Sequence, residues 1–524
     1  MRTGPVIACV SLLAGTLVAL SGTTAQAAST TYEAEASPAV CTGTIDSDWA
    51  GFTGTGFCNG TNAANAYAQF TVNAPAAGTA TLTVRFANGT TAARPAALTV
   101  NGSAVASSTY EATGAWTTWA TKTFTVPVNA GANTVRLNPT DAAGLPNIDR
   151  LDAETAGTTT PPSGSALYVA PNGTDGAAGT ISAPTTLSSA ISRVTSGGTI
   201  YLRGGTYHHS QTITIPAGSN GTAAARTKLS AYPGEQPVLN FSAMTEDPAN
   251  RGLAVNGSFW HVSGLVVERA GDNGIFVGGS NNVIERTVTR FNRDSGLQLS
   301  RIASTTPQSQ WPSHNLVLSA ESHDNADSDG EDADGFAAKL TVGPGNVFRY
   351  AVSHHNIDDG WDLYTKPDTG PIGTVTIEDS LAYENGTLSD GTQNASGDRN
   401  GYKLGGEDIA VDHVVRRSIA YRNGKHGFTY NSNPGSMAVS NNLSIDNAQR
   451  NYSFDAGTSV FRNNTSCRSA AGTNDRTIGD ADGSNQFWSG TNGSRCAAFS
   501  GALGWSYATD GRLAVTLGGR AVVL

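Results

Sequence analysis

Four aspartates and one lysine carry the clearest chemical information in this 524-residue chain. Asp334 lies in EDADGF, Asp358, Asp359 and Asp362 lie in SHHNIDDGWDLY, and Lys403 follows in RNGYKLGG. Carboxylates gathered this closely repel one another unless a cation lies between them. Ligation by oxygen alone suits Ca²⁺, which takes six to eight oxygens at about 2.3–2.6 Å. We therefore expect Asp334, Asp358, Asp359 and Asp362 to hold a calcium ion.

Lys403 is notable because lysine is scarce in this chain, while arginine is common. Its position between Tyr402 and Leu404 on an alternating strand places it on the opposite face from both. A lysine near a bound dication would have a lowered pKa, as a proton-abstracting base requires. Calcium and a lysine base together would serve elimination across a uronic acid. Lys339 and Lys366 lie close to the aspartates in sequence and are alternatives for steering uronate carboxylates.

Three further aspartates precede Asp334 in an acidic loop, and we expect them to face solvent or at most to hold a secondary ion: Asp327, Asp329 and Asp332. An insert over residues 385–400 precedes Lys403 and is a candidate for shaping a substrate subsite.

The N-terminus resembles a cleaved secretory signal over residues 1–27, with an apolar run too short to span a membrane. Its removal leaves four cysteines that form a near pair at each end of the chain. This arrangement fits two local disulfides in an oxidising compartment, Cys41–Cys58 and Cys467–Cys496. We therefore expect a secreted, extracellular protein.

Charged residues make up 14% of the chain, and the net charge is −10. This balance argues against a nucleic-acid partner. An acidic protein can still bind an acidic polysaccharide where a metal or local cations reverse the field. We expect a soluble monomer without a membrane partner.

A Pro/Ser/Thr/Gly linker over residues 156–166 divides the mature chain in two. Before it, residues 28–155 alternate apolar and polar side chains over short runs separated by turn residues such as Asn88-Gly89. This pattern predicts an antiparallel β-sandwich of the jelly-roll type. The whole chain is therefore expected to be all-β.

Residues 167–498 show imperfect repeats in which a short alternating strand leads to an asparagine. The aligned asparagines are Asn292, Asn325, Asn356, Asn385, Asn423 and Asn447. Their spacing of 24 to 38 residues, with one short strand group and no helix per repeat, predicts a parallel β-helix. We expect the asparagines to form an interior ladder at one corner. A short helix in LSSAISRV and a strand in GGTIYLRGGTY open this region, and residues 499–524 form a C-terminal extension.

The repeats, the DDGxDL motif and the lysine in NGYKLGG resemble family 9 of the polysaccharide lyases, the calcium-dependent pectate lyases with a right-handed parallel β-helix. The resemblance covers residues 167–467. It implies that Asp334, Asp358, Asp359 and Asp362 hold the catalytic calcium and that Lys403 removes the C5 proton of the sugar. The implied substrate is polygalacturonate or a related pectic polysaccharide of the plant cell wall, cleaved by β-elimination.

The N-terminal segment is similar to carbohydrate-binding modules of families 35 and 6, through YEAEAS, GAWTTWATKTFTVPV and LPNIDRLDAE. The resemblance implies a structural calcium at Glu33 and Glu35. It also implies that Asn147 contacts sugar, with Trp116 or Trp119 as an aromatic partner. We expect these tryptophans to lie on a strand edge, where they cannot both face the same way and at least one belongs to the core.

Two alternatives remain open at this point. One is a β-helix hydrolase of the polygalacturonase type, with Asp358 and Asp359 in a carboxylate set near His426 and with water as nucleophile. An exposed loop histidine is the simpler interpretation of His426. The other alternative is a non-catalytic secreted protein for carbohydrate binding or adhesion, in which the β-helix is a spacer.

Overall fold

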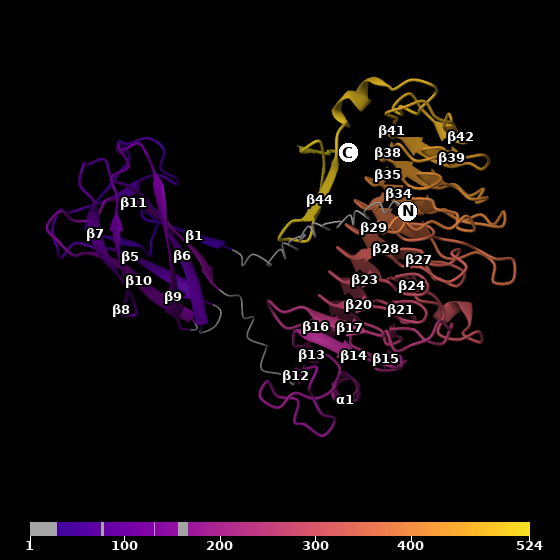
Figure 1. The fold of residues 1–524 in the computed structure, drawn as a ribbon, viewed down its shortest axis with the longest axis horizontal. Helices are drawn as coiled ribbons and strands as arrows, with labels where there is room; N and C mark the ends of the chain where they lie inside the picture. Colours follow the sequence, from indigo (N-terminus) through magenta and orange to yellow (C-terminus); the bar gives the residue numbers. More distant parts are fainter. Residues whose placement is uncertain (1–28, 75–77, 130, 156–165) are drawn as a thin grey trace, which may run out of the picture. The chain divides into compact units, whose positions relative to one another are not determined.

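A computed structural model describes residues 29–74, 78–129, 131–155 and 166–524. The chain divides into two compact units, Met1–Thr160 and Pro161–Leu524 (Figure 1). The predicted signal segment and residues 156–165 of the predicted linker lie outside the described residues. No helix within the described ranges is both long and apolar enough to cross a membrane.

The N-terminal unit is a sandwich of two antiparallel sheets, as predicted. Alternating side chains such as Phe70 and Val72, or Leu82 and Val84, are buried between the sheets. One sheet contains, in spatial order, β3 (Gly43–Asp46), β4 (Phe57–Gly60), β11 (Asn147–Thr155), β6 (Gly78–Ala87) and β9 (Ala120–Val128), with β1 (Ser29–Glu33) paired to β11. The other contains β2 (Val40–Cys41), β5 (Ala68–Ala74), β10 (Gly131–Pro139), β7 (Arg94–Val100) and β8 (Ser103–Tyr110). The predicted disulfide Cys41–Cys58 is present and joins β2 to β4 across the two sheets.

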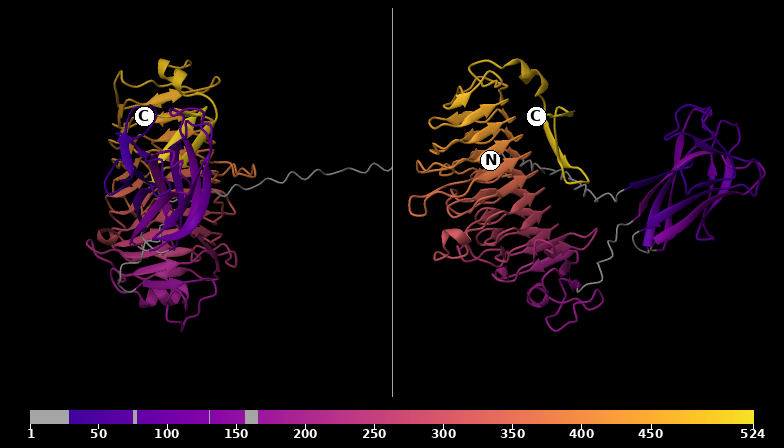
Figure 2. Two further views of the ribbon diagram at one scale, coloured as in Figure 1. Left: turned by 90° about the vertical axis from the view of Figure 1, so that its left-hand side faces the viewer. Right: turned by 180° about the vertical axis from the view of Figure 1, so that it is seen from behind.

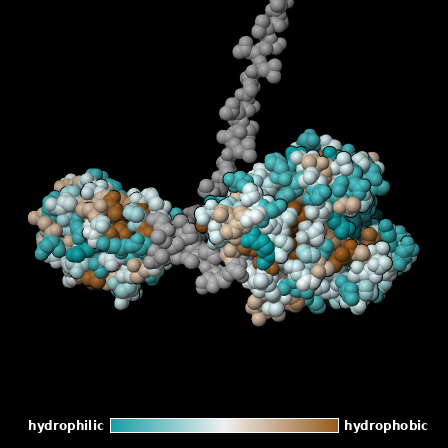
Figure 3. Space-filling view, turned by 90° about the horizontal axis from the view of Figure 1, so that it is seen from below, coloured by the Kyte–Doolittle hydropathy of each residue, from teal (hydrophilic) through white to brown (hydrophobic). Residues whose placement is uncertain are grey.

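The second unit is a parallel β-helix, which confirms the predicted fold. Its strands stack coil upon coil into three parallel sheets (Figures 1 and 2). The face seen in Figure 3 is mainly hydrophilic, with small hydrophobic patches.

The first sheet has twelve strands: β12 (Ala166–Val169), β13 (Thr199–Leu202), β16 (Thr227–Ala231), β19 (Trp260–Ser263), β22 (Val283–Glu285), β25 (Leu316–Leu318), β28 (Asn346–Arg349), β31 (Val375–Glu378), β34 (Val414–Arg416), β37 (Ala438–Ser440), β40 (Val460–Arg462) and β43 (Asp480–Ala481). The second has ten: β14 (Gly205–His208), β17 (Pro237–Asn240), β20 (Val266–Glu268), β23 (Val288–Arg290), β26 (Glu321–His323), β29 (Val352–His354), β32 (Leu381–Tyr383), β35 (Ile419–Tyr421), β38 (Leu443–Ile445) and β41 (Thr465–Cys467). The third also has ten: β15 (Ile213–Ile215), β18 (Leu253–Val255), β21 (Ile275–Val277), β24 (Leu297–Leu299), β27 (Phe336–Ala338), β30 (Trp361–Asp362), β33 (Tyr402–Lys403), β36 (Phe428–Thr429), β39 (Tyr452–Phe454) and β42 (Arg476–Thr477).

The predicted asparagine ladder runs inside the corner that follows the second sheet. Side-chain amides donate from each coil to the next, at 2.9 Å from Asn292 to Asn325 and 2.7 Å from Asn325 to Asn356. The ladder continues through Asn385, Asn423 and Asn447 and ends on Asn451. Two shorter ladders were not predicted: Asn282–Asn315–Asn346 and Asn442–Asn464–Asn485. These amides satisfy the buried polar groups of the corners.

The two ends of the β-helix are closed differently. The predicted short helix is α1 (Leu187–Arg193), capped by Thr186, and it packs Leu187 and Ile191 onto the core at the N-terminal end. At the other end, the predicted disulfide Cys467–Cys496 joins β41 to the 3₁₀ turn η2 (Ser494–Ala498).

The C-terminal extension forms a small antiparallel sheet that packs on the second sheet of the β-helix. Its strands are β44 (Leu503–Tyr507), β45 (Leu513–Leu517) and β46 (Arg520–Ala521). Val515 and Leu517 bury against Leu381 and Leu443, and Trp505 Nε1 donates to the Tyr383 hydroxyl at 3.1 Å. The extension therefore covers apolar side chains that the second sheet turns outward.

Candidate active site

The third sheet brings Asp362 and Lys403 side by side. Strands β30 and β33 pair in register, Trp361 with Tyr402 and Asp362 with Lys403. Trp361 and Tyr402 stack in the interior with ring centroids 4.8 Å apart. Side chains alternate along a strand, so Asp362 and Lys403 share the outer face. The predicted orientation of Lys403, opposite to the buried Tyr402 and Leu404, is confirmed.

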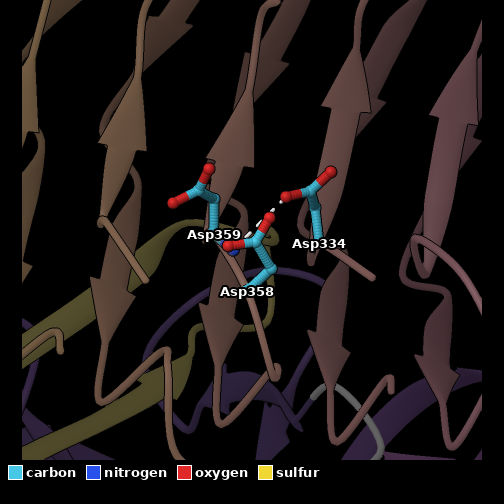
Figure 4. A group of neighbouring side chains, drawn as sticks. All are labelled: Asp334, Asp358 and Asp359. Atoms are coloured by element: carbon cyan, nitrogen blue, oxygen red, sulfur yellow. Dashed lines mark hydrogen bonds between the residues drawn. The ribbon is translucent and has the colours of Figure 1, made fainter. Parts of the chain in front are cut away.

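Three of the four predicted aspartates converge at the start of these strands. Asp334 precedes β27, and Asp358 and Asp359 precede β30, so adjacent coils place their carboxylates together (Figure 4). One oxygen from each lies within 4.8 Å of the others, and all three side chains are buried. Within the described part of the chain, no other group of three or more acidic, histidine or cysteine side chains is gathered in this way.

The hydrogen bonds of the triad leave part of its capacity unused. Asp358 Oδ1 accepts from the backbone N–H of Arg399 at 3.1 Å. Asp359 Oδ1 accepts from Asn400 N at 2.6 Å and from Asn400 Nδ2 at 2.9 Å. Asp359 Oδ2 is buried and has no hydrogen-bond partner among the described residues. A buried, acceptor-only set of carboxylate oxygens with a free lone pair fits a hard cation.

Two lysines lie against the carboxylates. Lys339 Nζ is 2.8 Å from Asp334 Oδ2 and 3.4 Å from Asp362 Oδ2. Lys403 Nζ is 3.3 Å from Asp359 Oδ2, 3.5 Å from Asp362 Oδ2 and 3.1 Å from Asp398 Oδ2. Asp362, the fourth predicted ligand, thus lies between the lysines and outside the triad. Lys339, which was considered for steering uronate carboxylates, is part of the site.

Burial and mutual repulsion dominate the electrostatics of the cluster. Burial raises the pKa of Asp359 to about 6, and burial together with neighbouring carboxylates raises the pKa of Asp334 and Asp358 well above the usual value. Burial disfavours the charge of Lys403, but Asp362, Asp359 and the other carboxylates outweigh it and raise its pKa. The expectation of a lowered lysine pKa assumed a bound dication. With the carboxylates alone the direction is reversed.

The site opens into a cleft of about 430 Å³, lined by Lys339, Asp362, Tyr364, Lys366, Asp398 and Lys403 among others. Tyr364 was not predicted. Its ring lies against Gly406, its hydroxyl donates to Glu407 Oε1 at 2.5 Å, and its centroid is 5.2 Å from Lys403 Nζ. Its position two residues after Asp362, on the same outward face, is the feature of the sequence from which it could have been found.

His426 differs from its expected position. It is 9% exposed, and it is not an exposed loop histidine. Its backbone N–H donates to Asn400 Oδ1 at 3.2 Å, and its Nδ1 accepts from the backbone of Arg450 at 3.2 Å. Burial, with the charges of Lys425 and Arg450, lowers its pKa to about 4. His426 is therefore a neutral side chain within the coil stack, two coils beyond Asp359.

The acidic loop before Asp334 has a structural organisation of its own. Asp327 accepts from four successive backbone N–H groups, those of Gly330, Glu331, Asp332 and Ala333. Asp329 and Asp332 are exposed, in agreement with the solvent-facing interpretation. The loop is therefore folded around Asp327.

In the N-terminal unit, Glu33 and Glu35 both lie beside Gly54. Glu33 Oε2 accepts from Thr53 Oγ1 at 2.9 Å, and Glu35 Oε1 accepts from Thr55 N at 2.7 Å. Burial is the main cause that raises the pKa of Glu33. Glu35 Oε2 is buried without a hydrogen bond in the described part of the chain. The two carboxylates are thus gathered, although the predicted ion itself stays a prediction.

The two tryptophans lie in the loop before β9, and the expected position on a strand edge is wrong. Both are half-buried and neither belongs to the core of the sandwich, so the expectation that at least one is a core residue is also wrong. Trp116 packs on Gly89 and Trp119 Nε1 donates to the carbonyl of Ala50 at 3.1 Å.

Asn147 is buried at the start of β11. The guanidinium of Arg94 connects the loop before Asn147 to the Trp116 ring. Arg94 donates to the carbonyl of Leu145 at 2.5 Å, and its carbon Cζ lies 5.6 Å from the Trp116 ring centroid.

Comparisons with known proteins match both units. The description "Pel9A-like, right handed beta helix region" applies to residues 167–474, and the family 6 carbohydrate binding module matches residues 34–155. Pectate lyase L of Paenibacillus polymyxa (strain SC2) is 55% identical over 324 residues, which cover 62% of this chain and 72% of that protein. Pectate lyase L of Thermoclostridium stercorarium is 46% identical over 56% of this chain, but the match spans only 23% of that protein. The crystal structure of pectate lyase Pel9A matches with a TM-score of 0.56 and 33% identity, over 65% of this chain and 84% of that one.

Proposed function

Because the chain belongs to the Pel9A-like right-handed β-helix family and is a polysaccharide lyase, we propose that it cleaves polygalacturonate by calcium-dependent β-elimination with Lys403 as the base. The observation that carries the proposal is the position of Lys403 Nζ in the cleft, 3.3 Å from Asp359 and beside the buried aspartate triad. Because the chain belongs to a lyase family, the hydrolase and the non-catalytic alternatives are set aside.

The aspartates fit a calcium ion through Asp334, Asp358 and Asp359, with Asp362 beside them. Bound calcium would neutralise a substrate carboxylate and make the adjacent C5 proton more acidic. Asp359 and Asp362 hold the Lys403 ammonium at the outer face of the third sheet. A deprotonated Lys403 accepts the C5 proton at Nζ. The C4–O4 bond then breaks, a double bond forms between C4 and C5, and solvent protonates the leaving oxygen.

Product analysis tests the reaction class. Incubation with polygalacturonate should raise both the ultraviolet absorbance of unsaturated product and the number of reducing ends. An excess of chelator should abolish both, and added Ca²⁺ should restore them. Reducing ends without absorbance would indicate hydrolysis, and full activity in chelator would remove calcium from the proposal.

The N-terminal unit is proposed to bind a plant cell-wall sugar of the uronic-acid class through Asn147 with Trp116 or Trp119. The arrangement of Glu33 and Glu35 beside Gly54 supports a structural calcium there. The two disulfides support export to an oxidising compartment. Isothermal titration of residues 28–155 with uronic-acid oligosaccharides tests the binding proposal.

A further inference from the structure

A fifth carboxylate, that of Asp398, lies between two lysines at the edge of the cleft. Lys403 Nζ is 3.1 Å from Asp398 Oδ2, and Lys425 Nζ is 2.6 Å from Asp398 Oδ1. The two ammonium groups therefore share one carboxylate and lie close to each other. The sequence does not indicate that Lys425 and Lys403 lie together, because the contact depends on how the insert over residues 385–400 folds back.

The backbone around this pair is held firmly. Lys425 N donates to the carbonyl of Arg399 at 2.9 Å, and the carbonyl of Lys425 accepts from Gln449 N at 2.7 Å. The backbone N–H groups of Asp398 and Arg399 both donate to Asp358 Oδ1. Lys425 is thus fixed to the coil before it and to the coil after it, and its position is set relative to the aspartate triad.

The charges at this edge are unequal. Lys403 contacts three carboxylates, those of Asp359, Asp362 and Asp398, whereas Lys425 has Asp398 as its one carboxylate partner among the described residues. The Lys425 side chain is 32% exposed, while that of Lys403 is 9% exposed. Lys425 can therefore meet a ligand from solvent, whereas Lys403 is enclosed by Asp359 and Asp362. A base must also be neutral when it accepts a proton. It cannot at the same time supply the positive charge that binds a neighbouring carboxylate.

Resting on the proposed lyase function, we propose that Lys425 is a substrate-binding residue that recognises the carboxylate of the uronic-acid unit next to the one that reacts. Lys425 is carried one coil beyond Lys403. Neighbouring coils are about 4.8 Å apart, close to the length of one pyranose unit, so a sugar chain running along the stack presents its next unit to the next coil. A charge-assisted contact between ammonium and carboxylate is the strong type of hydrogen bond.

The competing interpretation gives Lys425 a structural role only, in which it fastens the insert to the coil through Asp398. Partial methyl esterification of the substrate separates the two, because an ester removes the carboxylate charge without changing the sugar backbone. If Lys425 contacts the substrate, removing it weakens the dependence of KM on ester content, and if its contact is purely structural that dependence stays as in the wild type.

The test measures kcat and KM on polygalacturonate and on samples of increasing methyl-ester content, with calcium saturating. Lys425→Ala should raise KM on the unesterified polymer about tenfold, the loss expected for one charged hydrogen bond, while kcat falls much less. Its KM should then rise less steeply with ester content than the KM of the wild type, because both enzymes keep the proposed calcium contact and only the wild type also loses the Lys425 contact. Lys425→Arg should restore most of the affinity because it keeps the charge. Lys228→Ala, at an exposed lysine on β16 of the first sheet, is the matched control and should resemble the wild type.

Unchanged KM for Lys425→Ala, or an equal loss on all substrates, would overturn the inference. If Lys425→Ala does not fold, Lys425→Gln, which keeps a polar side chain able to bond Asp398, is measured in the same way. Failure of the proposed function would look different, because the wild type itself would then release no unsaturated product.

Discussion

The same coils carry two columns of stacked polar side chains, and the columns behave in opposite ways. In the asparagine ladder each amide donates to one neighbour and accepts from the other, as Asn356 does between Asn325 and Asn385. In the aspartate cluster the stacked groups only accept. Asp359 Oδ2 has no hydrogen bond among the described residues, and Lys339 and Lys403 approach the carboxylates instead.

The difference follows from how a β-helix repeats. Equivalent residues of successive coils lie directly above one another. Side chains of the same type therefore stack in a column and contact each other along the β-helix. A column of amides is self-complementary and stabilises the corner. A column of carboxylates repels itself and needs cations from elsewhere, here from lysines and, by the proposal, from calcium. The ladder is thus complete in the protein alone, while the cluster is ready for a ligand.

Among the changes considered, removal of the proposed base should cause the largest loss of activity. Lys403→Ala should lower kcat by at least ~10²–10⁴-fold, the usual contribution of a general base. Lys403→Arg should be nearly as poor, because guanidinium has a pKa above about 12 and does not accept the proton. Steady-state kinetics with unsaturated product as the readout provide the measurement. The activity of the wild type should rise with pH as Lys403 loses its proton.

Calcium affinity and circular dichroism control for folding in these variants. A Lys403→Arg enzyme with near-normal kcat would assign the base elsewhere, and Lys339 and Lys366 would be examined next.

Two substitutions, one in each column, test the difference between amides and carboxylates. Asn356→Asp places an acceptor-only carboxylate in the ladder and leaves the Oδ1 of Asn385 facing it, at a cost of about 3 kcal/mol or more. Asp359→Asn removes a repelling charge, so in chelator the variant should be at least as stable as the wild type. Its activity, measured with calcium present, should be lost. Denaturant unfolding in chelator measures both effects on stability. The two columns would be equivalent if the variants lost the same stability.

Calcium should stabilise the β-helix, and the gain should depend on pH. A calcium concentration of 100 times Kd adds about 2.7 kcal/mol. The pKa of Asp359 is raised to about 6 in the folded protein, above its unfolded value near 3.9. The folded state then binds more protons than the unfolded state between these values, so without calcium this contribution to stability is lost as pH rises through about 6.

The ligand must be deprotonated to bind the ion. The calcium-induced rise in Tm should therefore be full at pH 8 and shrink below about pH 6. Thermal unfolding with and without calcium at pH 5 and pH 8 gives the comparison, and Asp359→Asn should show a smaller rise at pH 8. An equal rise at both pH values would place the ion away from this cluster.

The contrast between the columns also explains what could be predicted from sequence. The ladder was predictable because repeats align the asparagines directly, and the outward face of Lys403 followed from strand alternation. The gathering of Asp334 with Asp358 and Asp359 was expected from their clustering in the sequence, whereas Asp362, expected in the same set, lies beside the lysines. These features depend on local periodicity and on the stacking of coils alone.

The features that were missed depend on loops and on long-range charge. Asp398 reaches Lys403 through the fold of the insert, which has no period in the sequence. Trp116 and Trp119 lie in a turn whose conformation depends on its packing. The raised pKa of Lys403 depends on several carboxylates from different coils, and His426 is buried because the coil stack continues past it.

The smallest effect is expected outside both columns, on removal of the N-terminal unit. The two compact units are divided at Thr160, and every residue of the proposed catalytic set lies in the second. A protein that begins near residue 167 should therefore keep kcat and KM on soluble polygalacturonate within about a factor of two, since no group that touches the substrate is removed. Activity on intact cell-wall material should fall more, because the sugar-binding unit no longer holds the enzyme at the surface. Paired assays on the soluble and the insoluble substrate measure the two effects, with residues 28–155 alone as the binding control. Loss of turnover on the soluble polymer would show that the β-helix needs the N-terminal unit for catalysis itself.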